Sequence, residues 1–323
     1  MRAARYLVRR LRHSVLLFVA ISVLAFAISQ LAPGTFLDEM RLNRQMSEQT
    51  IDSLRVQYGL DRPLPVRYLR WLASVATGEF GYSLAYNMPV SKLLWARMQN
   101  TLLLGTTAML IGWALAVPLG IWAAFRPRSW VDRSSSAVST LLLGTPELAL
   151  AMLFMLGAAH FGILPTGGMT SSHSQQTRWL AIADVVRHLV MPSVVLALAS
   201  APILLRHVRA AMLEAWNSPF VQAAKGHGVG NNRLLLRHAL PVAANPLISL
   251  FGLSLAGLIS GSFLIEVITG WPGLGPLFIN AVFARDLHVV IAVVMLFSVL
   301  LVLANLAGDL LLYAADPRVR AEC

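Results

Sequence analysis

Six long apolar segments, separated by polar stretches, dominate the pattern of this chain. Each segment is long enough to cross the hydrocarbon core of a membrane, about 30 Å thick, as an α-helix. Lipid offers the backbone no hydrogen-bond partners, so apolar runs of this length predict helices. The predicted spans are His13–Ala32, Thr101–Phe125, Ala137–Ala159, Leu189–Leu205, Pro246–Ile268 and Val289–Ala315.

A long polar connection follows the first span and has helical signals of its own. Ser47–Tyr58 reads as a helix with Ser47 as N-cap and Gly59 as a stop, and Val66–Ala76 reads as an amphipathic helix after a proline-rich break. The pattern therefore predicts an all-α integral membrane protein in three parts. These are a basic N-terminus with the first span at 1–32, an external helical subdomain at 33–100, and a five-helix domain at 101–323.

Composition supports a membrane class and the charge distribution orients the chain. Hydrophobic residues make up 57% and charged residues 13%, against about 25% charged in a typical soluble domain. The net charge is +11, but 15 of the 26 lysines and arginines lie in the N-terminus, 126–133, 206–237 and the tail. The excess of positive charge on these alternating connections predicts that both termini are cytoplasmic. Topology thus accounts for the basic balance without a nucleic-acid partner.

The connection between the fourth and fifth spans, 206–245, is predicted to form a helical hairpin. Ser218 and Pro219 are typical of a helix start, and Gly226 and Gly228 of its end. Phe220, Val221 and Ala224 are expected to share one face of the first helix. A second helix is predicted over Arg233–Leu240, ended by Pro241.

Three consecutive leucines, Leu234–Leu236, are too apolar for a solvated loop, so something must cover them. One interpretation is an interfacial helix with leucines in lipid and arginines among headgroups. The other is a docking surface for a second protein, because Ala223, Ala224 and Gly228 leave little side-chain bulk. The small residues favour docking.

The hairpin resembles the EAA loop of ABC-importer permeases. The resemblance rests on Ala223, Ala224, Gly228, Leu240 and Pro241, at the spacing of that family. Where the family has glutamate this chain has Gln222, which removes one charge and puts a specific ion pair at that point in doubt. Further motifs are similar to the dipeptide, oligopeptide and nickel permease group, and they occur in order along nearly the whole chain. They are Tyr58–Trp71, Gly78–Ser83, Gly144–Pro146, Glu266 with Trp271, Pro272, Gly273 and Gly275, and Asp316–Arg318.

The resemblance implies the first, longer-loop permease of a pair in a bacterial inner membrane. It implies a second permease subunit, two cytoplasmic ATPases and an external substrate-binding protein as partners. The chain has no G-x-x-x-x-G-K-[ST] phosphate loop, so ATP and Mg are expected on the ATPases, with no cofactor or enzymatic activity here. Peptide is the first choice of substrate, and nickel, glutathione and other small solutes stay open.

The helix Pro219–His227 is expected to enter a groove of an ATPase and to transmit its closure to the membrane helices. The residues assigned to this coupling surface are Phe220, Gln222, Ala223, Ala224, Gly226, His227, Gly228, Leu240 and Pro241.

Ionisable groups inside the spans are candidates for a substrate path, because charge in a membrane is costly. Glu147 follows Pro146 and is placed about ten residues into the third span. It either meets a cationic substrate group or makes a buried helix contact. Glu266, near the outer end of the fifth span, is either an outer gate or an ion-pair partner of Arg285.

Two other classes of protein are weighed. A proton-coupled secondary transporter acting alone would use Glu147 or Asp309 as a relay, but it predicts an internal repeat that the sequence lacks. An intramembrane hydrolase would need a nucleophile motif such as G-x-S-x-G or H-E-x-x-H, and neither occurs. The histidines lack the spacing of metal ligands, so no metal site is expected.

Overall fold

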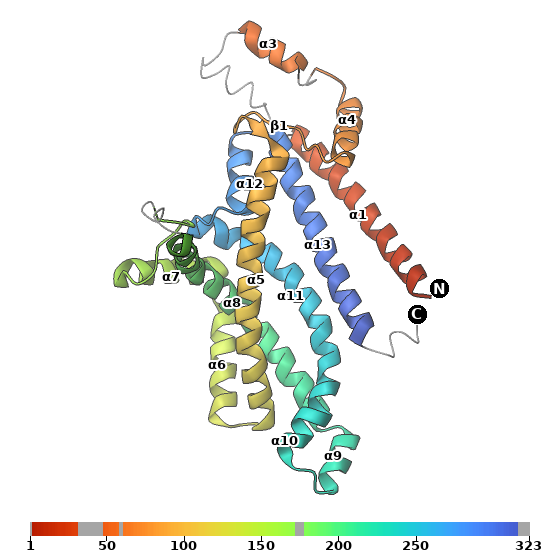
Figure 1. Cartoon of the computed structure of the whole chain (residues 1–323), viewed down its shortest axis with the longest axis vertical. Helices are drawn as coiled ribbons and strands as arrows, with labels where there is room; N and C mark the ends of the chain where they lie inside the picture. Colours follow the sequence, from red (N-terminus) through yellow and green to blue (C-terminus); the bar gives the residue numbers. More distant parts are fainter. Residues whose placement is uncertain (1, 32–47, 58–60, 172–177, 316–323) are drawn as a thin grey trace. The chain divides into compact units, whose positions relative to one another are not determined.

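A computed structural model describes residues 2–31, 48–57, 61–171 and 178–315. These residues are almost entirely helical (Figure 1). The chain divides into two units, which are described separately. One unit takes in residues 3–101 and 272–300, and the other takes in residues 102–271 and the chain from 301 onward.

The first unit contains the N-terminal helix, the connection after it, and part of the C-terminal region. Its elements are α1 (Arg2–Leu31), α3 (Glu48–Gln57), α4 (Leu64–Ala76), β1 (Tyr82–Ser83), β2 (Met88–Pro89), the start of α5 (Val90–Phe125), α12 (Leu274–Phe283) and the first half of α13 (Leu287–Ala315). Both helices predicted for the long connection are present. Pro63 precedes α4, where the fixed φ of proline suits a helix start. Ser47 and Gly59, the predicted cap and stop of the first, lie outside the described residues.

Aromatic packing holds α4 against α1. The ring centroids of Phe26 and Tyr68 are 5.5 Å apart, and those of Phe26 and Trp71 are 6.4 Å apart. Ile291 and Met295 of α13 complete this buried cluster. Helix α4 of the connection that was predicted to be external therefore packs on α1 and α13 through a small shared core.

A two-stranded antiparallel ladder departs from the all-α prediction. Tyr82 pairs with Pro89 and Ser83 with Met88. Asp286, which precedes α13, fixes this ladder from a distant part of the sequence: its carboxylate accepts hydrogen bonds from Ser83 Oγ at 2.6 Å and from the Ala85 amide at 3.2 Å. Strands this short carry no alternating pattern that the sequence could reveal.

The second unit is built around one central helix. Its elements are the rest of α5, α6 (Trp130–Gly144), α7 (Glu147–Phe161), α8 (Arg178–Trp216), α9 (Pro219–Gly226), α10 (Asn231–Leu234), a π-helical turn η1 (Leu235–Ala239), α11 (Leu240–Thr269) and the end of α13. Helix α8 packs against α6, α7 and α11, which explains why most of its positions from 188 to 208 are buried.

The third predicted span, Ala137–Ala159, is wrong as a single helix. Helices α6 and α7 meet at an angle of 103° across Thr145 and Pro146 (Figure 1). Proline has no N–H to donate and disfavours helical backbone in the residue before it, and Thr145 is extended at φ −97° and ψ 120°. Glu147 therefore begins α7 instead of lying ten residues inside a straight helix.

Four described helices are long and apolar enough to cross a membrane, and the bent pair α6–α7 makes a fifth if it counts as one span. The four are Val90–Phe125, Arg178–Trp216, Asn231–Thr269 and Leu287–Leu311. Within α1 the apolar part, Val15–Ile28, is shorter. The chain is thus a helical membrane protein with four to five candidate spans among its described residues, fewer than the six expected.

Glycines allow α11 and the end of α13 to cross closely. A Cβ atom added to Gly252 would lie 2.5 Å from Gly308 Cα, and the reverse substitution gives the same distance. No side chain fits between the two backbones at this point, so the crossing depends on both glycines.

Candidate functional site

The predicted hairpin begins where α8 ends and turns into α9. Ser218 precedes Pro219, as expected, but its side chain does not cap α9. Instead, Ser218 Oγ donates to the Ala215 carbonyl at 2.6 Å, at the C-terminal end of α8. The serine therefore satisfies a carbonyl of the preceding helix, while Pro219 starts the next one.

One face of α9 is buried in the core of the second unit. Val221 is 1% exposed, and Ala224 packs against the same cluster, which includes Met212 and Leu234. Phe220 is 45% exposed, so the expectation that it shares this face is wrong. Successive helical residues are turned by about 100°, and burial of Val221 directs Phe220 away from the core.

The opposite face of α9 is exposed and has little bulk. The exposed residues of the predicted coupling surface on α9 and in the turn after it are Phe220, Gln222, Ala223, Gly226, His227 and Gly228, and Pro241 is exposed on the other side of the hairpin. A Cβ atom added to Gly226 or Gly228 would meet nothing within 4 Å. Gly228 has φ +79°, a conformation that side-chain-bearing residues rarely adopt. This backbone angle turns the chain sharply after α9, the first arm of the hairpin.

Gln222 is bonded to its own chain. Its Nε2 atom donates to the Trp216 carbonyl at 2.9 Å, so the side chain of α9 satisfies the C-terminal end of α8. The Trp216 ring packs edge-on against Phe125 of α5, with centroids 4.8 Å apart. The family's glutamate has no N–H at this position, so it could not make the same bond.

The second arm of the hairpin, which consists of α10 and η1, continues directly into α11. Pro241 lies in the first turn of α11, and an unbroken helical segment runs over Asn231–Thr269, so the predicted end at Pro241 is wrong. The π turn Leu235–Ala239 comes immediately before, and its wider hydrogen bonding, from the Leu240 amide to the Leu235 carbonyl, accommodates a nearby proline.

The protein's own core covers most of the leucine run in this arm. Leu234 is fully buried and Leu235 packs against the same cluster, whereas Leu236 is 65% exposed. Two of the three leucines therefore need no external partner, contrary to expectation.

An ion pair joins the start of α6 to α8. Arg209 Nε and Nη2 lie 2.7 Å and 3.1 Å from the two carboxylate oxygens of Asp132. The Arg128 amide adds a 2.8 Å hydrogen bond to the same carboxylate. The Asp132 side chain is 8% exposed, so the sequence-based count of arginines in this region missed a buried structural contact.

Glu147 of the predicted substrate path lies against α11. A Cβ atom added to Gly261 would be 3.9 Å from both carboxylate oxygens of Glu147 and 3.4 Å from Leu196 Cδ1 of α8. The Glu147 side chain is half-buried, and it makes no hydrogen bond or ion pair with any other described residue.

Glu266, the other carboxylate of the predicted substrate path, is fully buried three residues before the end of α11. Within the described parts of the chain no three potential ligands cluster around a metal position.

The motif after α11 is structural and divided between the two units. Trp271 is fully buried in the core of the second unit. In the first unit, Asn100 Nδ2 donates to the Pro272 carbonyl at 2.8 Å, and the Leu274 amide donates to Thr101 Oγ1 at 2.9 Å. Gly273 and Gly275 are buried beside these bonds. The motif thus fixes the start of α12.

Long apolar helices joined by a short helical hairpin with a low-bulk exposed face place the chain among the helical membrane proteins. The chain belongs to the family described as binding-protein-dependent transport system inner membrane component, which matches residues 116–321. The N-terminal region of such membrane components matches residues 3–105. It is therefore a multi-pass permease of a binding-protein-dependent ABC transporter in a bacterial inner membrane, and the ATPase is a separate subunit.

Relatives with named transport systems match along nearly their full length. The oligopeptide transport system permease protein AppB of Bacillus subtilis is 35% identical, covering 98% of this chain and 99% of that protein. OppB of Mycobacterium tuberculosis is 32% identical with the same coverage, and the glutathione transport system permease protein GsiC of Salmonella paratyphi A is 32% identical, covering 98% of each.

Solved structures agree in fold. A chain of the inward-facing MetNI methionine ABC transporter superposes with a TM-score of 0.56 at 20% identity, over 69% of this chain and 96% of that one. A chain of an amino acid ABC transporter with histidines gives 0.52 over 71% and 94%. At this identity the likeness concerns the fold.

Proposed function

We propose that this chain is one of two different permease subunits of an oligopeptide importer. Support for the substrate class comes from the relatives, several of which are named as oligopeptide permeases. A glutathione permease is about as similar, and glutathione is itself a small peptide. Dipeptides and nickel remain weaker candidates.

In this proposal α9 is the coupling helix that docks on an ATPase subunit. The carrying observation is that one face of α9 is fixed in the core through Val221 while the opposite face presents Ala223, Gly226 and Gly228. A partner's groove can approach such a surface closely, and Phe220 can enter a pocket as an aromatic anchor. His227 and Gln222 border this surface.

Rigid mounting is what a coupling element needs. Helix α9 is bonded to the end of α8 through Gln222, and the second arm leads without a break into α11. A displacement of α9 on ATP-driven closure would therefore move two membrane helices, and alternating access would follow.

We further propose that the chain has six spans with both termini in the cytoplasm. The bent pair α6–α7 would supply one span and α1, with its apolar part Val15–Ile28, another. The basic residues Arg126, Arg209 and Lys225 would then all lie on the inner side, together with the coupling hairpin. An external binding protein would dock on the outer connections.

For the substrate path we propose that Glu147 receives the ammonium end of a peptide. Its carboxylate is half-buried and lies beside Gly261, a residue that has no side chain to shield the charge. Glu266, buried near the end of α11, would act at the outer end of the same path.

Site-directed crosslinking tests the coupling proposal. Cysteine at Ala223, in an otherwise cysteine-free chain made by Cys323→Ser, should crosslink to an ATPase subunit in membranes, and the yield should change when ATP is bound. Cysteine at Glu214, which is exposed on α8, is the matched control and should react far less. If cysteine at Ala223 crosslinks to an ATPase subunit no more than cysteine at Glu214 does, the coupling proposal fails.

A further inference from the structure

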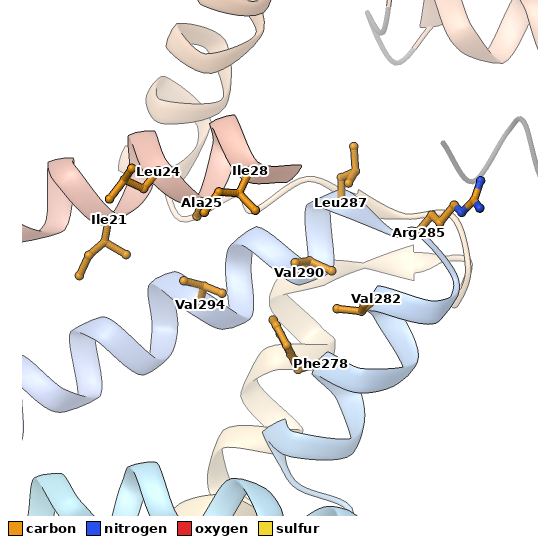
Figure 2. A pocket seen from close by; sticks show the side chains of 10 residues that line it. All are labelled: Ile21, Leu24, Ala25, Ile28, Phe278, Val282, Arg285, Leu287, Val290 and Val294. Carbon is orange, nitrogen blue, oxygen red and sulfur yellow. The ribbon is translucent and has the colours of Figure 1, made fainter. Parts of the chain in front are cut away.

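An apolar groove lies within the first unit, between α1, α12 and the start of α13 (Figure 2). Its volume is about 420 Å³. Helix α1 contributes Ile21, Leu24, Ala25 and Ile28, and the facing side consists of Phe278, Val282, Leu287, Val290 and Val294. Arg285 is the only charged residue among the described residues of the lining. The groove runs along α13 for about 10 Å, from Leu287 to Val294, at 1.5 Å per residue.

Arg285 lies at one end of this groove, and its guanidinium points away from the apolar side chains (Figure 2). The side chain is exposed and makes no hydrogen bond or ion pair with the described residues. The neighbouring carboxylate of Asp286 is already bonded to Ser83 and to the Ala85 amide. No described residue therefore neutralises the arginine charge, which can meet a ligand.

The backbone of Arg285 is strained. It has φ 51° where the chain leaves α12, a position at which glycine is the usual residue. Strain at a side-chain-bearing residue points to a function when a specific feature accompanies it. Here the feature is a single cation at the mouth of an apolar groove.

We propose that the groove holds the acyl chain of an anionic phospholipid whose phosphate binds Arg285. The lining is suited to a hydrocarbon chain, and a guanidinium is suited to a phosphate because it offers paired donors.

The experiment uses the purified complete transporter in detergent, with phosphatidylglycerol added and phosphatidylethanolamine as the lipid control. Bound lipid is counted by native mass spectrometry, and the thermal midpoint is followed in parallel. Arg285→Gly removes the charge and relieves the strained backbone, so the variant should fold at least as well as the parent. Arg128→Gly is the matched control, because Arg128 also has a positive φ, 64°, but does not line the groove. Val290→Trp fills the groove and leaves Arg285 in place.

The parent complex should retain phosphatidylglycerol in preference to phosphatidylethanolamine. Arg285→Gly should weaken phosphatidylglycerol binding about tenfold, and Val290→Trp should abolish it. Arg128→Gly should bind as the parent does. Binding within twofold of the parent in Arg285→Gly, or an equal loss in Arg128→Gly, overturns the proposal. So does a cysteine at Val290 that crosslinks to another permease chain in membranes, since a protein then occupies the groove.

Discussion

The ion pair between Asp132 and Arg209 gives the sharpest stability prediction. Replacing Asp132 with alanine removes the acceptor for Arg209 Nε, Arg209 Nη2 and the Arg128 amide. Loss of one partner costs about 3–5 kcal/mol for a fully buried pair and up to about 1 kcal/mol for an exposed one. The Asp132 side chain is 8% exposed and that of Arg209 is 32% exposed, so the pair lies between these limits. We expect a loss of about 2–3 kcal/mol.

A double-mutant cycle measures this pair directly. For a unit of this size each kcal/mol shifts the unfolding midpoint by about 2–4 °C, so Asp132→Ala should lower it by about 5–10 °C. Thermal unfolding of the purified complex, followed by intrinsic fluorescence, provides the readout. Arg209→Ala should cost a comparable amount. The double variant should be much less destabilised than the sum of the two, with a coupling of about 2 kcal/mol. A coupling below about 0.5 kcal/mol would refute the reasoning, because the two losses would then be independent.

Three further predictions concern packing, coupling and substrate. Gly252→Leu should destabilise the complex by about 1–3 kcal/mol, since its Cβ would lie 2.5 Å from Gly308 Cα, whereas Gly257→Leu has open space and should change the thermal midpoint little. Gln222→Glu places a carboxylate oxygen against a carbonyl that the amide now satisfies at 2.9 Å. It should lower transport per ATP hydrolysed in proteoliposomes by several-fold, and unchanged coupling would contradict the assigned bond. Glu147→Gln should reduce uptake of peptides with a free amino terminus by about tenfold and leave uptake of N-acetylated peptides unchanged, and equal effects on both would exclude the ammonium contact.

Local sequence signals predicted helix α9 within one residue. Pro219 fixes the start and the glycines at 226 and 228 fix the end, and these signals act through φ angles and missing side chains that need no tertiary context. The amphipathic helix α4 was predicted with its observed end at Ala76, but with a start at Val66, two residues after the observed start at Leu64. The buried face of α9 was not predicted correctly, because it depends on packing against α8 and α10. Phe220 was therefore placed on the buried face, although it is exposed.

Proline was the residue whose effect the sequence predicted least well. Pro146 lies in a continuous apolar run, and hydropathy says nothing of the direction in which a helix axis runs. The 103° bend between α6 and α7 could therefore not be inferred. Pro241 was expected to end a helix and instead lies in the first turn of a long one. A helix can continue past a proline where a neighbouring turn changes the spacing of its hydrogen bonds. The π turn before Pro241 makes this change. The bond between Ser83 and Asp286 spans 203 residues and lies beyond any local signal.

Two helices connect the hairpin to the proposed substrate position, and this argues for a short mechanical route between them. Val221 of α9 is buried in one cluster with Met212 of α8 and Ala243 of α11. Farther along, Gly261 of α11 lies beside both Leu196 of α8 and the carboxylate of Glu147. A shared, close-packed core resists independent movement of its parts, so a shift of α9 is transmitted to both helices together. We infer that coupling changes the width of the space beside Glu147 by moving α8 and α11 relative to α7, which Pro146 separates from α6.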